Sequence, residues 1–296
     1  MVRRYLVTGT EGQVVNALIE KAAGHDDIEI VLLGLPEFDL TATAMIAPAI
    51  VARRPDAILS VAAYTAVDAA ESDEATALAV NCTAVGEIGK AAAELGVPVV
   101  HLSTDYVFDG EKPSAYVETD PPGPVGAYGR TKLGGELALA AATPDHAILR
   151  TAWVYSPFGK NFVKTMLRLA ETRDTLGVVA DQIGNPTSAL DIAEAMLTVA
   201  GNLLTSHDAA ARGVFHMTGF GDVAWADFSE EIFRLSAELG GPSAAVERIP
   251  TSAYPTPARR PRNSCLDCTR LERVHGIRLP DWRESTAVVV RRLLGA

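Results

Sequence analysis

The chain has 296 residues, of which 48% are hydrophobic and 21% are charged, and its formal net charge is -11. This length and composition predict a soluble globular protein with a large core, since no apolar run approaches the roughly 20 residues of a membrane span. The negative charge argues against nucleic acid as a partner, because nucleic acid binding draws on a basic surface. An anionic substrate would instead need a local cluster of arginines.

The cysteines and the start of the chain indicate a compartment. The three cysteines are too few for a disulfide framework, and the CxxC pattern of Cys265 and Cys268 has no second pair of ligands. Two ordinary thiols are therefore favoured over a zinc site. The first strand-like segment begins at about Arg4, which leaves no room for a signal peptide. We expect a cytoplasmic protein without a metal site.

The chain opens with a strand, a glycine turn and a helix. The short apolar strand 6–8 runs directly into a turn that contains Gly9 and Gly12, and an apolar helical pattern follows. In this context backbone N–H groups at a helix N-terminus hold a dinucleotide pyrophosphate. Val15 stands where the pattern has a third glycine, which serves helix-to-strand packing, so the match is weaker but the phosphate site is retained.

The second strand, 28–33, is apolar enough to be buried on both faces of a parallel sheet. It ends in Leu33 and Gly34, so the carboxylate that reads a ribose hydroxyl in NAD-specific sites is absent from its expected place. This absence leaves room for NADPH. Asp39 follows, and two interpretations of it stay open: a contact near the adenine, or a turn that caps the next helix, 43–54.

Two further strands end in residues typical of a ligand-binding edge. The third strand, 56–60, is followed by the small residues of 62–68, and the fourth strand, 97–102, leads into Ser103, Thr104 and Asp105. Ligands in doubly wound sheets bind beyond the carboxyl ends of the strands. A long alanine-rich helix is predicted between them, at about 71–95. It contains Asn81, for which a solvated polar side chain is favoured over a site residue.

Tyr128 and Lys132 form a Tyr-x-x-x-Lys pattern. In a helix, a spacing of four places the phenol and the ammonium on one face, about 6 Å apart along the axis. A free tyrosine has a pKa of roughly 10, and a nearby cation favours its phenolate, so we expect Lys132 to lower the pKa of Tyr128. Thr104 could donate a hydrogen bond to a carbonyl oxygen while Tyr128 supplies its proton.

Three glycines in the same segment indicate a close approach to the backbone. Each glycine inside a helix costs on the order of 1 kcal/mol relative to alanine. Because Gly129, Gly134 and Gly135 occur together, we expect something to lie against this backbone.

The order of elements predicts the fold class and the domains. A fifth strand, 146–150, completes five strand-helix alternations, which predict an α/β fold with a Rossmann-type doubly wound parallel sheet in residues 1–150. A periodic helix brings about 188–210 back to this lobe. Residues 151–187 and 211–296 are predicted to form a smaller C-terminal substrate-binding lobe. It contains the only dense basic cluster, 259–262, either a diphosphate site or a solvated loop.

Taken together, these segments resemble the extended short-chain dehydrogenases/reductases, and more closely the dTDP-4-dehydrorhamnose reductase family. The resemblance spans nearly the whole chain in the family's order. The motifs that carry it are Gly9-x-x-Gly12-Gln13, Ala62-Ala63-Tyr64-Thr65-Ala66-Val67-Asp68, Ser103-Thr104-Asp105-Tyr106-Val107-Phe108-Asp109-Gly110, Tyr128-x-x-x-Lys132, Arg150-Thr151-Ala152-Trp153-Val154-Tyr155, Asp181-Gln182-Ile183-Gly184-Asn185-Pro186-Thr187, Tyr254-Pro255-Thr256-Pro257-Ala258 and Arg260-Pro261.

The resemblance implies reduction of the C4 carbonyl of dTDP-4-dehydro-β-L-rhamnose to dTDP-β-L-rhamnose with NADPH, or with NADH in some relatives. This is the last step of dTDP-L-rhamnose biosynthesis. In that reading Tyr128 protonates the alkoxide, Thr104 orients and polarises the carbonyl, and Lys132 holds the nicotinamide ribose. The implied cofactor contacts are Gly9, Glu11, Gly12, Gln13, Val14, Asp39, Leu40, Ala62, Ala63, Tyr64, Tyr128 and Lys132. The implied substrate contacts are Val67, Thr104, Asp105, Tyr106, Tyr128, Trp153 and Arg260.

One departure from the family concerns a metal. Some relatives bind magnesium at a homodimer interface through glutamates, one of them in the first helix, and that position is Ala17 here. We therefore expect no such metal, and a homodimer of this chain would lack the magnesium-bridged interface.

Other functions remain to be weighed against this one. Related 4,6-dehydratases place an Asp-Glu pair after the threonine, whereas Asp105 is followed here by Tyr106, so the elimination base is missing. A 4-epimerase would need a strongly NAD-selective acid, which is not evident. Reductases of other dTDP-4-keto-6-deoxysugars share nearly every motif and stay an alternative. So does a non-catalytic binding subunit like the regulatory subunit of methionine adenosyltransferase, although the intact reductase residues favour an enzyme.

Overall fold

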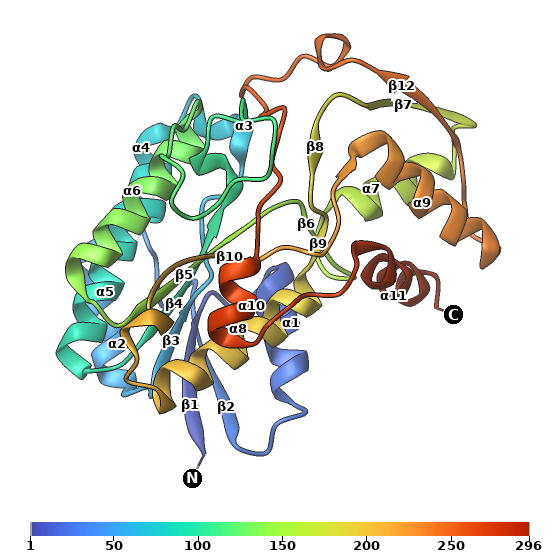
Figure 1. Cartoon of the computed structure of the whole chain (residues 1–296). Helices are drawn as coiled ribbons and strands as arrows, with labels where there is room; N and C mark the ends of the chain where they lie inside the picture. Colours follow the sequence, from blue (N-terminus) through green and yellow to red (C-terminus); the bar gives the residue numbers. More distant parts are fainter. Residues whose placement is uncertain (1, 296) are drawn as a thin grey trace.

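A six-stranded sheet forms the centre of the larger lobe, and all of its neighbouring strands are parallel (Figure 1). The computed structural model describes residues 2–295. The strand order is β2-β1-β3-β4-β5-β10, so the winding reverses between β1 and β3, where doubly wound sheets bind ligands. The predicted fold class is confirmed. The strands are β1 Arg3–Thr8, β2 Ile28–Leu33, β3 Ala57–Ser60, β4 Val99–Thr104, β5 His146–Thr151 and β10 Gly213–His216.

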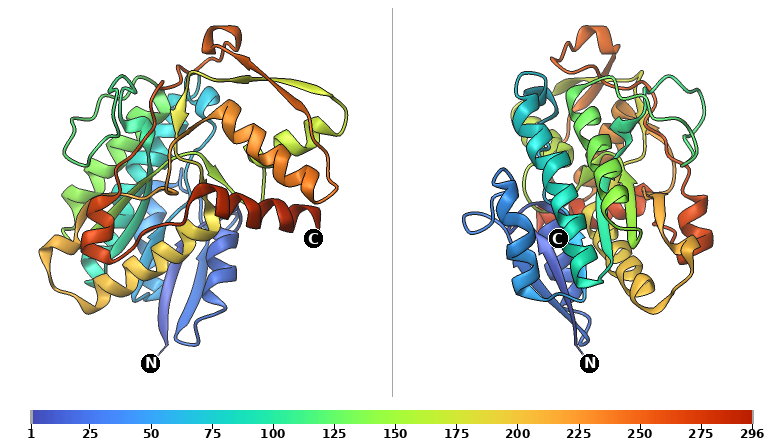
Figure 2. Two further views of the ribbon diagram at one scale, coloured as in Figure 1. Left: turned by 45° about the vertical axis from the view of Figure 1, so that its right-hand side comes forward. Right: turned by 90° about the vertical axis from the view of Figure 1, so that its left-hand side faces the viewer.

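Helices cover both faces of this sheet because successive strand residues point to opposite sides. Tyr5 and Val7 belong to the core cluster of α1 and α8, whereas Leu6 belongs to the cluster formed with α2, α5 and α6. Figure 2 shows the two helical layers on either side of the sheet. The helices are α1 Gln13–Ala22 and α8 Ala189–Thr205 on one face, and α2 Ile46–Arg53, α5 Ala84–Leu95 and α6 Ala127–Ala142 on the other.

The predicted helix at 71–95 is interrupted. It consists of α3 (Val67–Ala70), α4 (Glu74–Leu78), a π-helical turn η2 (Ala79–Thr83) and then α5. Asp73 starts α4 by accepting a hydrogen bond from the backbone N–H of Thr76 at 3.4 Å. The alanine-rich composition predicted the helical character, but it carries no signal for the π turn.

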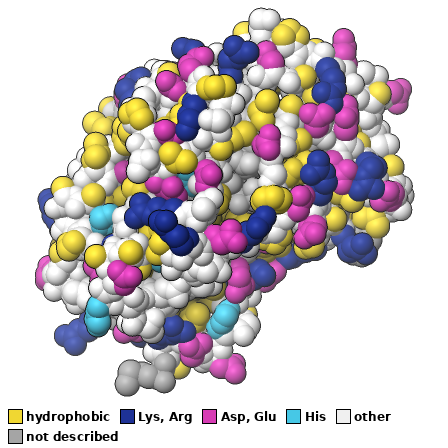
Figure 3. Space-filling view, viewed as in Figure 1, with side chains coloured by type: hydrophobic (Ala, Val, Ile, Leu, Met, Phe, Trp, Pro, Cys, Tyr) yellow, Lys and Arg dark blue, Asp and Glu magenta, His cyan; other side chains and the backbone are white. Residues whose placement is uncertain are grey.

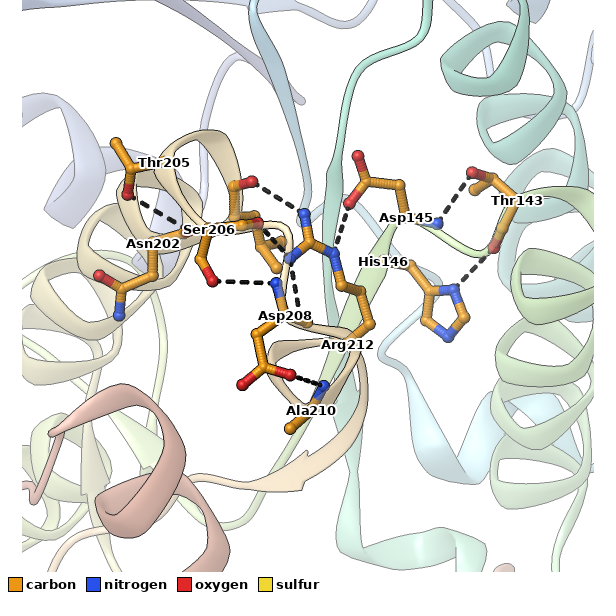
Figure 4. A network of polar contacts seen from close by, with 10 residues as sticks. Thr143, Asp145, His146, Asn202, Thr205, Ser206, Asp208, Ala210 and Arg212 are labelled. Atoms are coloured by element: carbon orange, nitrogen blue, oxygen red, sulfur yellow. Dashed lines mark hydrogen bonds and ion pairs between the residues drawn. The ribbon is translucent and has the colours of Figure 1, made fainter.

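The return to the larger lobe is longer than predicted. β10 pairs with β5 in parallel, so the return extends to His216 and not only to 210. Arg212 secures it, since its guanidinium donates to the carbonyl of Leu203 at 2.9 Å, near the end of α8, and to the carboxylate of Asp145 at 3.0 Å (Figure 4). The short elements of this lobe are η1 Thr43–Met45, η3 Asp105–Val107, η4 Ala209–Ala211 and α10 Thr269–His275.

The smaller lobe combines short paired strands with three helices. Its aromatic side chains Tyr155, Phe228 and Trp282 belong to the same hydrophobic cluster as α1 and α8, so the two lobes share one core. Its elements are β6 Val154–Tyr155, α7 Phe162–Ala170, β7 Thr175–Val179, β8 Ile183–Gly184, β9 Thr187–Ser188, β11 Val223–Ala224, α9 Trp225–Glu238, β12 Ala245–Ile249, η5 Thr251–Ala253 and α11 Trp282–Leu294.

The surface carries both signs of charge. Acidic and basic side chains are interspersed on the face shown in Figure 3. Within residues 2–295, no helix is long and apolar enough to cross a membrane, and no group of three or more metal-binding side chains is found.

Candidate active site

The glycine turn after β1 offers free backbone donors at the start of α1. Gly9 and Gly12 have φ angles of 103° and 118°, which favour glycine. A Cβ at Gly12 would meet no atom within 4 Å, and no side chain caps α1. The first N–H groups of the helix are therefore available to an anion. Val15, in place of a third glycine, is buried, and its Cγ2 would lie 3.4 Å from a Cβ at Gly9.

The end of β2 explains the missing carboxylate. A Cβ at Gly34 would lie 2.8 Å from the backbone nitrogen of Thr10, so no side chain fits there. Asp39 is exposed, and its Oδ1 accepts hydrogen bonds from the N–H and the hydroxyl of Thr41, both at 2.8 Å. It therefore forms a turn, but no side chain caps the following η1, whose N-cap is Ala42. The adenine contact of Asp39 stays a prediction.

The exit of β3 is fixed by two side chains. Thr8 Oγ1 accepts hydrogen bonds from the N–H groups of Val61 and Ala62 at 2.9 and 3.0 Å. Asn81 pairs with both backbone groups of Tyr64, at 2.8 and 3.1 Å, and its amide also lies 3.2 Å from the hydroxyl of Thr131 on α6. Asn81 is fully buried, so the solvated interpretation was wrong. It ties the predicted cofactor backbone to the helix of Tyr128 and Lys132.

The predicted catalytic residues come from β4 and α6. Thr104 is the last residue of β4, and Tyr128 and Lys132 lie near the start of α6. Lys132 is 2% exposed, and its Nζ donates to the carbonyl of Leu102 at 2.8 Å. The ring of Tyr128 packs edge-on against Tyr106, with centroids 5.5 Å apart. Leu102 and Tyr106 flank Thr104 along the chain, so the three predicted groups lie at one edge of the sheet.

The pKa values differ from the expected ones. Burial raises the pKa of the Tyr128 phenol well above its ordinary value, the carboxylate of Asp105 raises it further, and a hydrogen bond with Thr104 opposes both. The expected lowering by Lys132 is not found, because burial dominates and the ammonium is directed at β4. Burial also lowers the pKa of Lys132 to about 8, against the opposing charge of Glu136.

The glycines of α6 accommodate the protein's own backbone. A Cβ at Gly129 would collide with the carbonyl of Tyr106, and one at Gly135 would collide with the carbonyl of Asn81. A Cβ at Gly134 would lie 3.0 Å from the sulfur of Cys82. The expected close approach is thus made by η3 and η2, which places α6 tightly against the site.

Trp153 is held in an unusual conformation. Its φ is 48°, in the left-handed region that a bulky residue rarely adopts. One face of its indole stacks on Trp225, with centroids 3.5 Å apart and planes 9° apart, and a Cβ at Gly184 would lie 2.7 Å from the indole nitrogen. Trp153 lies two residues after Thr151, the residue of β5 that pairs with Thr104 of β4. The smaller lobe therefore fixes an aromatic side chain beside the strand end that carries Thr104.

Arg260 joins the two lobes. Its guanidinium donates to the carboxylate of Asp68 at 2.6 Å and to the hydroxyl of Tyr106 at 3.2 Å. The side chain of Arg260 is 22% exposed, so Arg260 is not part of a solvated loop. The side chain of Arg259, in contrast, is 63% exposed and pairs with Glu111. Three arginines line a cavity of about 320 Å³, whose lining residues are Asp181, Thr251, Tyr254, Pro255, Thr256, Ala258, Arg259, Arg260 and Arg262.

A larger cavity of about 820 Å³ contains none of the predicted site residues. It lies beside the smaller cavity, since Asp181 and Arg262 line both. Phe220 and Ile183 line it with partly exposed side chains.

The other residues that are predicted to contact the cofactor or the substrate differ in exposure and in their partners. Glu11 is exposed, and the side chain of Val14 is buried, so Val14 offers only its backbone. The amide oxygen of Gln13 accepts hydrogen bonds from Ser156 and Asn161 at 2.8 and 2.9 Å. Leu40 packs against the core cluster of α2, and Val67 begins α3.

Sequence reasoning missed three polar or aromatic contacts of this site. They are Asn81, the partner of Tyr64; Asp68, the partner of Arg260; and Trp225, which stacks on Trp153. Each partner is distant in sequence. Only Asp68 belongs to one of the family motifs, 62–68, where its acidic charge beside small residues was the available signal.

Comparisons with known proteins place the chain among sugar-nucleotide reductases. A family model described as the RmlD substrate binding domain matches residues 3–294. A dTDP-4-dehydrorhamnose reductase from Sinorhizobium fredii is 54% identical over 98% of both chains. A solved dTDP-4-dehydrorhamnose reductase from Clostridium acetobutylicum covers 98% of this chain and 99% of its own at 36% identity, with a TM-score of 0.91. Another, from Bacillus anthracis in complex with NADP, covers 99% and 100% at 30% identity, with a TM-score of 0.90.

Proposed function

The chain belongs to the RmlD family of dTDP-4-dehydrorhamnose reductases, and from this we infer that it reduces the C4 carbonyl of dTDP-4-dehydro-β-L-rhamnose to dTDP-β-L-rhamnose with NADPH. It is thus an NAD(P)H-dependent oxidoreductase of dTDP-L-rhamnose biosynthesis. The roles of individual residues below are proposals.

The residues at the switch point fit a dinucleotide. Gly12 and the uncapped start of α1 offer backbone donors to the pyrophosphate. The backbone that follows β3 is fixed by hydrogen bonds, and its small residues Ala62 and Ala63 would let the cofactor approach closely. Gly34 at the end of β2 leaves no carboxylate to repel a ribose 2′-phosphate, which supports NADPH over NADH. When bound, NADPH supplies the hydride that reduces C4.

Tyr128 is the proposed proton donor. Reduction of a carbonyl leaves an alkoxide that must gain one proton, so the donor has to be protonated beforehand. The raised pKa of the buried phenol keeps it protonated at neutral pH. Lys132, whose pKa is about 8, is mainly cationic there, and its proposed role is to hold the nicotinamide ribose beside Tyr128.

Thr104 and Arg260 are proposed to orient the substrate. The hydroxyl of Thr104 lies at the strand end beside Tyr128 and donates to Asp105 in this structure; it would turn from Asp105 to donate a hydrogen bond to the C4 oxygen. Arg260 lines the smaller cavity, where its guanidinium would hold a diphosphate through paired hydrogen bonds. Asp105 is bonded to Thr104, Tyr106 packs against Tyr128 and Trp153 stacks on Trp225; all three are proposed to contact the sugar.

The observation that carries these roles is the meeting of Thr104, Tyr128 and Lys132 at the edge of the sheet beside the uncapped α1. The test is NADPH consumption with dTDP-4-dehydro-L-rhamnose generated in situ, with the product identified by chromatography against dTDP-L-rhamnose. Tyr128→Phe should abolish turnover and leave the affinity for NADPH unchanged. Normal turnover by this variant would refute Tyr128 as the proton donor.

The same assay separates the alternatives. Oxidation of NADPH only with a different dTDP-4-keto-6-deoxysugar would identify another reductase. No oxidation with any of these sugars, by NADPH or NADH, would favour a non-catalytic binding subunit.

The compartment and the assembly are also proposals. We place the reaction in the cytoplasm, where NADPH is available, and propose a homodimer without a magnesium-bridged interface. Ala17, at the position of the family's interfacial glutamate, is buried against the chain's own core. Cell fractionation and sedimentation with and without a chelator test these statements; a dimer that dissociates when magnesium is removed would overturn the second.

A further inference from the structure

His101 lies directly behind Lys132. It is fully buried on β4, and its Nε2 lies 3.3 Å from Nζ of Lys132. Its Nδ1 lies 3.0 Å from the hydroxyl oxygen of Ser60 on the neighbouring strand β3. Both ring nitrogens therefore have partners, whereas Nε2 of His216, another fully buried histidine, has none among the described residues.

These contacts determine where the imidazole proton lies. A lysine ammonium can only donate hydrogen bonds, so Nε2 of His101 must accept and carries no hydrogen. The proton of the neutral ring is then on Nδ1, which donates it to Ser60. Lys132 therefore selects this tautomer, and the hydroxyl of Ser60, which can donate or accept, takes the acceptor role.

The same contacts fix the ammonium. It has three N–H donors, of which one is directed to the carbonyl of Leu102 and one to His101. We propose that His101 is a positioning residue: together with Leu102 it anchors Lys132, so that one N–H remains for the cofactor ribose beside Tyr128. This inference rests on the role of Lys132 in the proposed function.

The charged surroundings keep His101 in this role. Lys132 on α6 and His146 on β5 face the ring, and protonation of Nε2 would place its hydrogen against the ammonium. Burial, followed by the charges of these two groups, lowers the pKa of His101 well below its ordinary value. Glu136, one helical turn beyond Lys132, opposes the lowering of the lysine pKa. The imidazole therefore stays a neutral acceptor at neutral pH.

The first test replaces the ring. His101→Leu removes the acceptor, and we expect kcat to fall about tenfold or more, because a hydrogen bond to a charged group is lost. The basic limb of the pH profile should move to lower pH, because a buried ammonium that loses an acceptor also loses its proton more easily. The KM for the sugar nucleotide should change little. His101→Gln, whose amide oxygen can accept from Lys132, should restore kcat to within about threefold.

His216→Gln is the matched control. His216 is also fully buried in the sheet, but its Nδ1 contacts the carbonyl of Tyr116 and not Lys132. This variant should keep the pH profile of the unaltered enzyme. A folded His101→Leu with unchanged kcat and pH profile would overturn the proposal.

A second measurement needs no variant and decides the matter if His101→Leu does not fold. Long-range proton–nitrogen NMR of the unaltered protein should show His101 neutral with its proton on Nδ1 across the activity range. A proton on Nε2 would overturn the proposal, since Lys132 could not then donate there.

Lys132→Met separates the proposed role of Lys132 from the inference that His101 positions it. If this variant still reduces the sugar at the normal rate, the proposed role of Lys132 fails and with it the reason for His101. If Lys132→Met is inactive and His101→Leu is normal, only the inference on His101 fails.

Discussion

Thr104 and Asp105 are joined by a hydrogen bond of 2.9 Å, in which the threonine hydroxyl donates to Oδ1 of the carboxylate. The other oxygen, Oδ2, is buried and has no partner among the described residues. Burial raises the pKa of Asp105 to about 6, and the nearby hydroxyls of Ser264 and Thr104 oppose this rise. A carboxylate kept in such surroundings destabilises the fold, which is typical of a residue retained for binding or catalysis.

Asp105→Asn should therefore stabilise the protein while lowering kcat/KM for the sugar. Below the ordinary pKa of 3.8 both states of the chain hold the proton and the two proteins should differ little. The cost of ionising Asp105 in the folded state grows between pH 3.8 and about 6, where the unfolded chain loses the proton that the folded chain still holds, and above that it is constant at about 3 kcal/mol at most. Thermal unfolding across this pH range measures it. An asparagine variant that is less stable at neutral pH would contradict the expectation.

Asp109→Asn is a control of opposite sign. The carboxylate of Asp109 accepts hydrogen bonds from the hydroxyl of Tyr116 at 2.6 Å and from the N–H of Glu111 at 3.0 Å. The first of these is the main cause that lowers its pKa. Its stabilising effect is present above the unfolded pKa and is lost as pH falls, so this variant should lower Tm at neutral pH and not in acid.

Arg150 and Glu136 form a buried ion pair behind the site. Both side chains are 4% exposed, and the guanidinium donates to the carboxylate at 2.6 and 3.0 Å, while Ser103 donates to it at 2.5 Å. Glu136→Gln or Arg150→Met leaves one buried charge without its partner, so each should lower the free energy of unfolding by about 3–5 kcal/mol. Denaturant unfolding measures this, and the double variant should lose less than the sum.

Arg130→Met serves as the exposed comparison. Arg130 pairs with Glu74 at 2.9 Å, but both side chains are 46% exposed. Its loss should change the free energy of unfolding by at most about 1 kcal/mol. If Arg130→Met costs as much as Arg150→Met, burial is not what sets the cost.

Local patterns in the sequence predicted most of the fold. The strand at 28–33 was placed with the same bounds as β2, because its apolar run is short and ends in glycine. β10 was missed: its four residues are too short for a distinctive pattern, and its place in the sheet follows from the return of α8. The π turn around Asn81 was missed because no local pattern marks it, and the pairing of Asn81 with the backbone of Tyr64 joins separate elements.

In the site, too, local patterns predicted some features, whereas tertiary contacts set the others. Tyr128 and Lys132 are four residues apart, so helical spacing alone brought them together. The pKa of Tyr128 went against the expectation, because it depends on burial by segments that are distant in sequence. The stacking of Trp225 on Trp153 likewise joins residues from separate elements, and no local spacing encodes it.

The glycines of α6 should be intolerant of alanine. A Cβ at Gly129 or Gly135 would meet a backbone carbonyl, which cannot move aside as a flexible side chain can. Gly129→Ala should cost about 1–3 kcal/mol of stability and should lower kcat/KM, because the carbonyl it displaces belongs to Tyr106. Unfolding and turnover are measured on the same preparation.

Gly177→Ala is the matched control for these variants. It lies on β7, where a Cβ would make an ordinary contact of 3.5 Å with Ile249. This change should be neutral or slightly stabilising. Equal losses for Gly129→Ala and Gly177→Ala would mean that backbone contact is not the reason.

Arg259 and Arg260 are adjacent in sequence but differ in exposure. Arg260 bridges Asp68 and Tyr106 with a half-buried side chain, whereas Arg259 is largely exposed and pairs only with Glu111 in the described structure. Arg260→Met should raise the KM for the sugar nucleotide about tenfold or more, because the proposed charge-assisted contact to the diphosphate and a link between the lobes are both lost. The affinity for NADPH should not change.

Arg259→Met removes the same charge one residue away and should raise the KM by less than about threefold, because an exposed ion pair contributes little. The two variants have the same net charge, so they separate a direct contact from long-range attraction of the anionic substrate. KM measured at low and high salt completes the comparison. Equal effects that disappear at high salt would show that the arginines act through the general field, and Arg260 would then lose its place as a substrate contact.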